Sequence, residues 1–460
     1  GRAELIVGNR EGDLVLYEQE ADGVWTARGP IEGDSPNAVG THALVGGRYS
    51  APLVRDANGD GRPDLVVGQL EYGPAVALDD PAFPYRAQLD EFLAYAREHR
   101  LELIPHLFTH HFRTANAERE EIALHRQMFR ALGIPWELTG ANQHTWRVNA
   151  ADPLQTFRVE SEAGIWFNFG FRSPGAPDDP AWGSSYLWGM PFLLEAGGLN
   201  GPMVLHTPVR GFGNGRARGV YESYVRFDLP IDYFEHVEYH FPDRVGELLA
   251  FVRELDRIRD EADYNFVSEP QLARSALTAL LGDVRVRQPL ASWVWDRLRD
   301  FLRGGFHFNI RLVPDTRRVP AELAGGYRDA PGVSVEPGTP LAGYRLDTDS
   351  PIYARMNGKL YVGLPRPAGV GIGWGPERAH LVRCNVPFRL APDESGGTRI
   401  FLDGDGIQQI KLYSPRPLDI AAADADAPLK IETSRSGDGY AYVVTHFGGP
   451  VALRVSETFR

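Results

Sequence analysis

Two groups of ionisable side chains have the residue types and the spacing of a metal-dependent hydrolytic site. Asp79 and Asp80 follow the short apolar segment 75–78, and His106 and His110 lie four positions apart after the next apolar segment. If the chain turns helically there, both imidazoles share one face, and with one carboxylate they form a metal site with positions open for water and substrate. Taken alone, the same residues also fit a loop start and a pair of capping or core histidines.

The segments around these residues predict alternating strands and helices. We expect strands at 75–78, 101–105 and 165–171, and helices at 85–100, 118–132 and 243–262. The apolar residues of the helices recur on one face, and Gly133 stands where the second helix should end. This rhythm favours a parallel barrel or a doubly wound sheet, in which functional side chains gather at the carboxyl ends of the strands.

The order of strand, Asp-Asp, helix, strand and His-x₃-His resembles the NodB-homology polysaccharide deacetylase family over residues 74–285. The resemblance implies a distorted (β/α) barrel in which Asp79 is the general base. It also implies that a divalent metal, Zn²⁺ by preference, is held by Asp80, His106 and His110. Leu107 departs from the family pattern, which has Ser or Thr at this place in the second motif.

Two weaker matches to the same family lie further along the chain. Phe171-Arg172-Ser-Pro174 resembles its Arg-x-Pro motif, which implies that Arg172 orients the base, although an ordinary surface ion pair explains this arginine equally well. Val237-Glu-Tyr-His240 resembles its last motif and implies His240 as general acid, with His236 as the competing candidate. The family's Asp/Trp motif has no clear counterpart.

A polar and aromatic segment without a family role follows the second helix. Asn142, His144 and Trp146 are residue types that line sugar grooves, because indole faces stack on pyranose rings while amide and imidazole groups bond hydroxyls. An ordinary polar loop is an equally good interpretation.

The N-terminal segment contains a repeat. Gly1–Gly8 recurs as Gly61–Gly68, and the second copy follows an Asp/Asn/Gly loop, whereas the sequence begins inside the first copy, so we expect the natural chain to start earlier. This loop offers oxygen ligands of the kind that Ca²⁺ requires, namely the side chains of Asp56, Asn58, Asp60 and Asp64 and the carbonyl of Arg62. A solvated turn is the alternative.

The loop and its flanking apolar segments resemble the FG-GAP/VCBS repeat, a β-propeller blade unit with a calcium loop. A propeller needs at least four blades, so residues 1–73 are expected to form only a fragment of one. After a predicted helix at 293–302, residues 286–460 become short strands separated by Gly and Pro, which predicts a β-sandwich. We therefore expect three parts, 1–73, 74–285 and 286–460.

Composition narrows the classes of partner and cofactor. The 48 Lys and Arg against 61 Asp and Glu give a net charge of −13, so the chain as a whole repels phosphate backbones and anionic lipid, which disfavours nucleic acid as a partner. Cys384 is the single cysteine, so an intramolecular disulfide and a cysteine-based zinc site are excluded. No run of 18 apolar residues occurs, so no membrane span is expected in this chain.

These features together predict a metal-dependent enzyme that removes N-acetyl groups from an amino-sugar polysaccharide. Calcium loops of this class fill outside the cytosol, so a secreted, periplasmic or cell-surface location is expected. Two alternatives stay open: a carbohydrate O-acetyl esterase, and a non-catalytic carbohydrate-binding protein on the same barrel.

Overall fold

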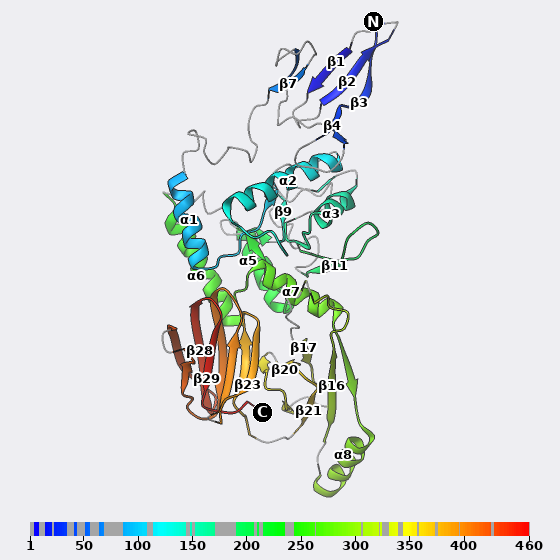
Figure 1. Ribbon diagram of the computed structural model, residues 1–460. Coiled ribbons are helices and arrows are strands. Elements are labelled where there is room, and N and C mark those ends of the chain that lie inside the picture. The colour runs from blue at the N-terminus through cyan, green and yellow to red at the C-terminus, as the bar shows by residue number, and fades with distance from the viewer. Residues whose placement is uncertain are drawn as a thin grey trace. The chain divides into compact units, whose positions relative to one another are not determined.

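The computed structural model divides the chain into two compact units (Figure 1). Unit 1 comprises Gly1–Leu93 and Leu103–Glu235, and unit 2 comprises Ala94–Glu102 and His236–Arg460. The structure describes residues 4–8, 14–20, 23–34, 41–43, 51–55, 64–68, 86–107, 114–143, 148–149, 152–170, 190–206, 209–210, 215–234, 243–262, 264–304, 307–321, 323, 331–338, 344–356, 358–372, 376–394, 396–424 and 427–459.

Unit 1 begins with small antiparallel sheets. Strands β1 (Glu4–Gly8), β2 (Leu14–Gln19) and β3 (Trp25–Pro30) form one of them. The other two are pairs, β4 (Glu32–Asp34) with β5 (Thr41–Ala43) and β6 (Ala51–Arg55) with β7 (Asp64–Gly68). The two copies of the sequence repeat thus contribute β1 and β7, each to an antiparallel hairpin.

Short parallel strands alternate with helices in the rest of unit 1. The strands are β8 (His106–Leu107), β9 (Asn142–Gln143), β10 (Phe167–Asn168) and β12 (Met203–Leu205), with β11 (Phe192–Leu194) antiparallel to β12. A parallel bridge between Ala141 and Asn168 joins β9 to β10. A separate parallel pair is β13 (Val209–Arg210) with β14 (Tyr233–Phe234). The strands that the structure describes do not close into a barrel.

The helices of unit 1 form where the sequence provides caps and an apolar stripe. Helix α2 (Ala115–Leu132) begins at Thr114, whose hydroxyl accepts from the Ala117 amide at 3.2 Å, and ends at Gly133, whose φ of 68° suits a left-handed C-cap. Helix α3 (Pro153–Glu162) begins at Asp152. The remaining helices are α1 (Arg86–Glu98), which continues into unit 2, and α5 (Gly215–Arg226).

The helix predicted at 118–132 and its end at Gly133 are therefore confirmed. The strand predicted at 101–105 is wrong, because the parallel pairing begins only at His106. The strand predicted at 165–171 is reduced to Phe167–Asn168.

Unit 2 starts with helices and two small antiparallel sheets. The helices are α6 (Val245–Ala262), α7 (Glu269–Leu281) and α8 (Leu290–Arg303). One sheet has the order β15 (Asp283–Arg287), β16 (Asn309–Asp315), β21 (Ala368–Ile372) and β18 (Leu346–Thr348). The other has the order β17 (Gly332–Val335), β20 (Lys359–Gly363) and β19 (Tyr353–Met356).

The C-terminal part of unit 2 consists of two four-stranded antiparallel sheets that share one hydrophobic core. The first has the order β22 (His380–Cys384), β25 (Gly406–Ser414), β28 (Gly439–Gly448) and β27 (Leu429–Ser436). The second has the order β23 (Phe388–Pro392), β24 (Thr398–Leu402), β29 (Val451–Val455) and β26 (Ile420–Ala422). Leu381, Leu412 and Val444 of the first pack with Ile400 and Leu453 of the second. This is the arrangement of a β-sandwich.

One glycine of unit 1 allows two neighbouring parallel strands to approach. A Cβ built on Gly140 would lie 2.0 Å from the ring of Phe167, which is fully buried. We predict that Gly140→Ala lowers the free energy of unfolding by about 1–3 kcal/mol, because the ring has no room to move away. Gly197→Ala, where a Cβ meets nothing within 4 Å, is the control. Equal stability of both variants in urea unfolding would contradict this packing.

Candidate functional site

The carboxyl ends of four parallel strands lie side by side in unit 1. The ladder that joins them runs from the Asn142 amide to the Pro105 carbonyl at 3.3 Å, from the Phe169 amide to the Ala141 carbonyl at 3.1 Å, and from the His206 amide to the Asn168 carbonyl at 3.1 Å. Ligand sites in open α/β sheets occur at such edges, so the side chains at this edge are the first candidates for function.

Side chains alternate between the two faces of this parallel sheet. Leu107 and Ala141 lie on the face that packs against α2 and α3, in a core with Ile122 and Val159. The register places the remaining strand-end side chains on the opposite face, here called the site face: His106, Asn142, Phe167, Phe169 and His206. Phe169 contacts Phe167, with ring centroids 5.2 Å apart, and His206, at 5.5 Å.

His106 and Asn142 are paired on the site face. His106 Nδ1 forms a short hydrogen bond with Asn142 Oδ1. Because an amide oxygen only accepts, this bond requires the hydrogen on Nδ1, and in the neutral ring Nε2 then carries the lone pair. A histidine that binds a metal through one ring nitrogen usually donates the hydrogen of the other nitrogen to an oxygen of the protein or of water.

His206 is the second histidine of the site face, and the sequence patterns did not single it out. Its side chain is fully buried. Burial lowers its pKa to about 4, although the nearby backbone of Met190 favours the protonated ring and so raises the pKa. The ring is therefore neutral at physiological pH. An apolar strand that ends in histidine, Met203-Val-Leu-His206, is the signal that could have found it.

A fully buried carboxyl group ties two of these strand ends together from the helix side. Glu160 of α3 accepts a hydrogen bond from Gln143 Nε2 at 2.5 Å, and Asn168 Nδ2 donates to its two oxygens at 2.8 and 3.1 Å. Burial, with a smaller contribution from the nearby Glu118, raises the pKa of Glu160 to about 8, although the hydrogen bonds from Asn168 and Gln143 oppose the shift. Glu160 shares its helix face with Thr156 and Phe157, and an acid within a buried stripe is the sequence signal that was missed.

Glu118 of α2 is a second buried acid on the helix side. It accepts from the Thr156 hydroxyl at 2.6 Å and from Gln155 Nε2 at 3.2 Å. Burial raises its pKa to about 7, although both hydrogen bonds oppose the shift. Two acids with raised pKa values thus hold α2, α3, β9 and β10 together.

Two of the predicted site residues, His106 and Asn142, have described side chains, and the structure brings them into contact. His106 lies in a strand, so the helical turn that would align it with His110 does not begin at His106. Leu107 faces the helices and belongs to the core, where a Ser or Thr would have no polar role. Asp64 starts β7. The other candidates lie outside the described residues: Asp56, Asn58, Asp60, Arg62, Asp79, Asp80, His110, His144, Trp146, Arg172, His236 and His240.

The described residues contain no cluster of three His, Cys, Asp or Glu that could hold a metal ion. The predicted ligand set includes Asp80 and His110, which lie outside that part of the chain. Among the predicted ligands, the tautomer of His106 is therefore what can be compared with the needs of a metal ion. A ring with its hydrogen on Nδ1 is suited to coordinate a metal through Nε2.

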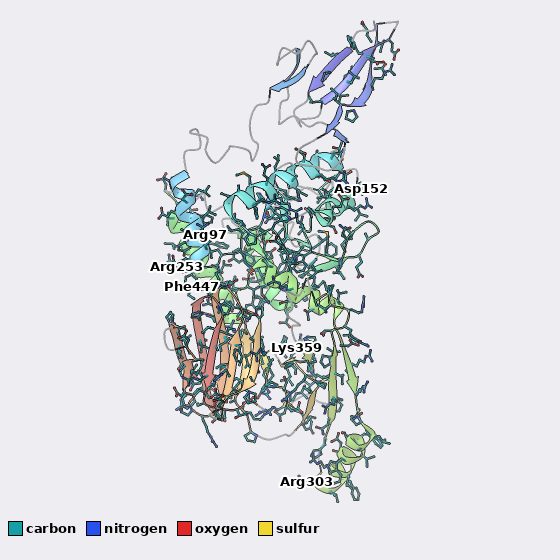
Figure 2. All side chains as sticks on the ribbon, viewed as in Figure 1. Arg97, Asp152, Arg253, Arg303, Lys359 and Phe447 are labelled. Atoms are coloured by element: carbon teal, nitrogen blue, oxygen red, sulfur yellow. The ribbon has the colours of Figure 1, made fainter. Side chains whose placement is uncertain are left out.

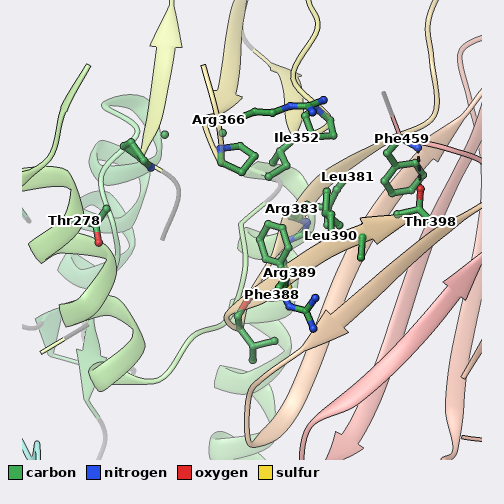
Figure 3. Close-up of a pocket in the computed structure, with 18 of the residues that line it drawn as sticks. Thr278, Ile352, Arg366, Leu381, Arg383, Phe388, Arg389, Leu390, Thr398 and Phe459 are labelled. Carbon is green, nitrogen blue, oxygen red and sulfur yellow. Dashed lines mark hydrogen bonds between the residues drawn. The ribbon is translucent and has the colours of Figure 1, made fainter. Parts of the chain in front are cut away.

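A separate cavity of about 750 Å³ lies in unit 2, near α7 and the sandwich. The side chains of Arg366, Arg383, Phe388, Arg389 and Phe459 line it, and Figure 3 shows them around the opening. The described residues that line it include no carboxylate and no histidine. Its chemistry suits an anion rather than acid–base catalysis, so the strand-end edge of unit 1 is the better candidate for a hydrolytic site.

Comparison with known families identifies the N-terminal segment. Residues 1–67 match the FG-GAP-like repeat. The matched range covers β1–β6 and β7 except its last residue, Gly68, and it confirms the resemblance expected for this part of the chain. Neither the curated proteins nor the solved structures contain a match to this chain. Among the described helices, none has the length and hydropathy needed to cross a bilayer.

The raised pKa of Glu160 predicts a pH-dependent stability. Between about pH 4.5 and pH 8 the folded protein retains a proton that the unfolded chain has lost, so the free energy of unfolding falls as the pH rises through this window. Glu118 contributes in the same direction up to about pH 7.

We predict that Glu160→Gln flattens this decline and is more stable than the native protein above about pH 8, because the amide keeps the acceptor oxygen without a charge. Urea unfolding from about pH 5 to about pH 9 measures it. Glu162→Gln, on the exposed end of the same helix, is the control. A decline of unchanged size in Glu160→Gln would refute the buried-acid assignment.

Proposed function

We propose that the chain is a metal-dependent deacetylase that acts on an N-acetylated amino-sugar polysaccharide, with its metal-binding edge in unit 1. The observation that carries the proposal is the position of His106 at the carboxyl end of a parallel strand, with Nδ1 bonded to Asn142 Oδ1, so that the lone pair of the neutral ring is on Nε2. This is the form of imidazole that coordinates a divalent cation. The order of Asp-Asp and His-x₃-His along alternating strands and helices supports the same assignment.

In this proposal the strands continue into a deacetylase-type barrel, and Asp80, His106 and His110 hold the divalent ion, with Zn²⁺ preferred. A bound ion of this kind supplies Lewis-acid polarisation of the acetyl carbonyl. Asp79 accepts the proton of the attacking water, and Arg172 orients this carboxylate. His240 donates a proton to the departing amine, because an amide nitrogen is too basic to leave as an anion.

His206, the second histidine of the site face, is compatible with a bound cation because its ring is uncharged. His206 is neutral at physiological pH, so it adds no positive charge that would repel a cation bound nearby. Phe167 and Phe169 provide apolar surface beside it, which limits the access of water. Asn142, first considered as part of a sugar groove with His144 and Trp146, positions His106 in this account.

We further propose that the loop between β6 and β7 binds Ca²⁺ and that the protein acts outside the cytosol. The register of this hairpin places Arg55 opposite Asp64, the two residues that flank the segment 56–63. A segment between paired flanking residues can bring the oxygens of Asp56, Asn58, Asp60 and Asp64 around one ion. The match of this segment to the FG-GAP-like repeat agrees with that interpretation.

The enzymatic proposal predicts metal-dependent release of acetate. We expect the purified chain to hold one divalent ion and to release acetate from N-acetylated amino-sugar polymers, with activity lost on chelation. His106→Ala should abolish both properties. Asn142→Leu should lower metal affinity by about 10–100-fold, because the ring loses the partner that fixes its tautomer. Metal content by elemental analysis and acetate by an enzymatic assay are the measurements.

The controls separate this function from its alternatives. His307→Ala, a histidine of unit 2, should change neither metal content nor activity. Acetate from O-acetylated polymers alone would identify an esterase, and a bound metal without any acetate would identify a binding protein. A chain that holds no divalent ion under any loading condition contradicts the proposal itself.

The calcium proposal predicts one weak site. Isothermal titration should give a dissociation constant of about 10⁻⁴–10⁻³ M, the range of extracellular calcium modules. Asp56→Asn with Asp60→Asn should remove binding, whereas Asp90→Asn, an exposed acid on α1, should not. Unchanged binding in the double variant would contradict the site.

A further inference from the structure

Helix α8 exposes its apolar residues and turns its acids inward, the reverse of the usual amphipathic arrangement. Asp296 is the one buried residue of this helix. Phe301 is 85% exposed, Leu290 75% and Leu302 67%. The other exposed large apolar side chains of the helix are Trp293, Val294, Trp295 and Leu298.

A polar stripe attaches α8 to the start of β16. Asp296 accepts from Asn309 Nδ2 at 2.5 Å, and Asp300 accepts from the His307 amide at 2.6 Å and pairs with His307 Nδ1 at 2.8 Å. Arg297 donates to the His307 carbonyl at 2.7 Å. These contacts fix which face is turned outward, so the exposure of the apolar face follows from specific bonds.

The charged residues of α8 are also divided between its two faces. Its exposed charged residues are Arg299 and Arg303, while Asp296 and Asp300 face β16. Arg287, at the end of β15, is also exposed. The outward surface is therefore apolar and cationic in a chain whose net charge is −13.

Helix α8 connects the first two strands of a four-stranded sheet. Strands β15 and β16 pair antiparallel up to Arg287 opposite Arg311, α8 lies in the connection between them, and β21 pairs with β16 on its other side. Figure 1 shows α8 beyond the end of the strands β15 and β16, and Figure 2 shows Arg303 there. A helix in such a connection can present its exposed face to a flat surface without a change in the sheet.

We propose that α8 is an interfacial anchor that binds the surface of an anionic lipid bilayer. Tryptophan, phenylalanine and leucine side chains partition into the boundary between headgroups and acyl chains, and arginines beside them are attracted to anionic headgroups. A second copy of the chain fits less well, because pairing two such faces would bring Arg299 and Arg303 of both copies together while their acids face the other way.

The test uses the full chain in flotation with vesicles of phosphatidylcholine, with and without phosphatidylglycerol. We expect binding that requires phosphatidylglycerol and weakens with salt. Phe301→Glu with Leu302→Glu should reduce it by roughly tenfold or more, and Arg299→Gln with Arg303→Gln by about tenfold. Phe227→Glu, at an exposed apolar residue of unit 1, is the control and should bind like the native chain.

Three results would overturn the proposal. The first is no flotation with anionic vesicles while circular dichroism shows a folded chain. The second is equal loss of flotation in Phe227→Glu, which would mean non-specific adsorption. The third is a dimer in light scattering that Phe301→Glu dissociates, with no binding to vesicles, which would assign the face to a second copy.

Discussion

The hydrogen bonds of the buried Glu160 carboxyl group hold the candidate site of unit 1 together. Strands β9 and β10 are each two residues long, so their backbone ladder alone offers little to fix their ends. Glu160 adds side-chain bonds to Gln143 on one strand and to Asn168 on the other. Since Asn142 directly precedes Gln143, the same bonds determine where its amide meets His106.

The two faces of the parallel sheet differ in their buried ionisable groups. On the helix side, acids with raised pKa values are buried among hydrogen-bond donors, which is tolerable because a protonated carboxyl group loses much less on leaving water than a carboxylate does. On the site face the ring of His206 is neutral as well. The chemistry proposed for this edge therefore takes place next to a framework that carries little charge at moderate pH.

The sequence predicted those elements whose signals are local. The helix at 118–132 was found because its apolar spacing and the glycine that ends it, Gly133, are local signals, whereas the cap at Thr114 was missed and the helix begins earlier, at Ala115. The strand expected at 101–105 was displaced, because parallel pairing depends on a partner some 36 positions away, Asn142 opposite His106. The stripe of α3 could have marked Glu160 as a buried acid, but its partners come from β9 and β10, which no local pattern connects to α3.

Helix α8 was predicted from the sequence, but the direction of its apolar face was not. Its apolar periodicity predicted a helix at 293–302, and the structure has one at Leu290–Arg303. Such a stripe normally faces a core, but here the bonds of Asp296 and Asp300 to Asn309 and His307 turn the polar side inward. The direction of the face is thus decided by tertiary contacts.

If the strand end at His106 is the metal-binding edge of a catalytic site, zinc should bind there. Anomalous diffraction at the zinc absorption edge, on crystals of the full chain grown with Zn²⁺, locates the ion. We expect an anomalous peak within coordination distance of His106 Nε2, with Nδ1 still bonded to Asn142. A peak coordinated by Nδ1 of His106, or full zinc occupancy at a place away from this strand end, would contradict it.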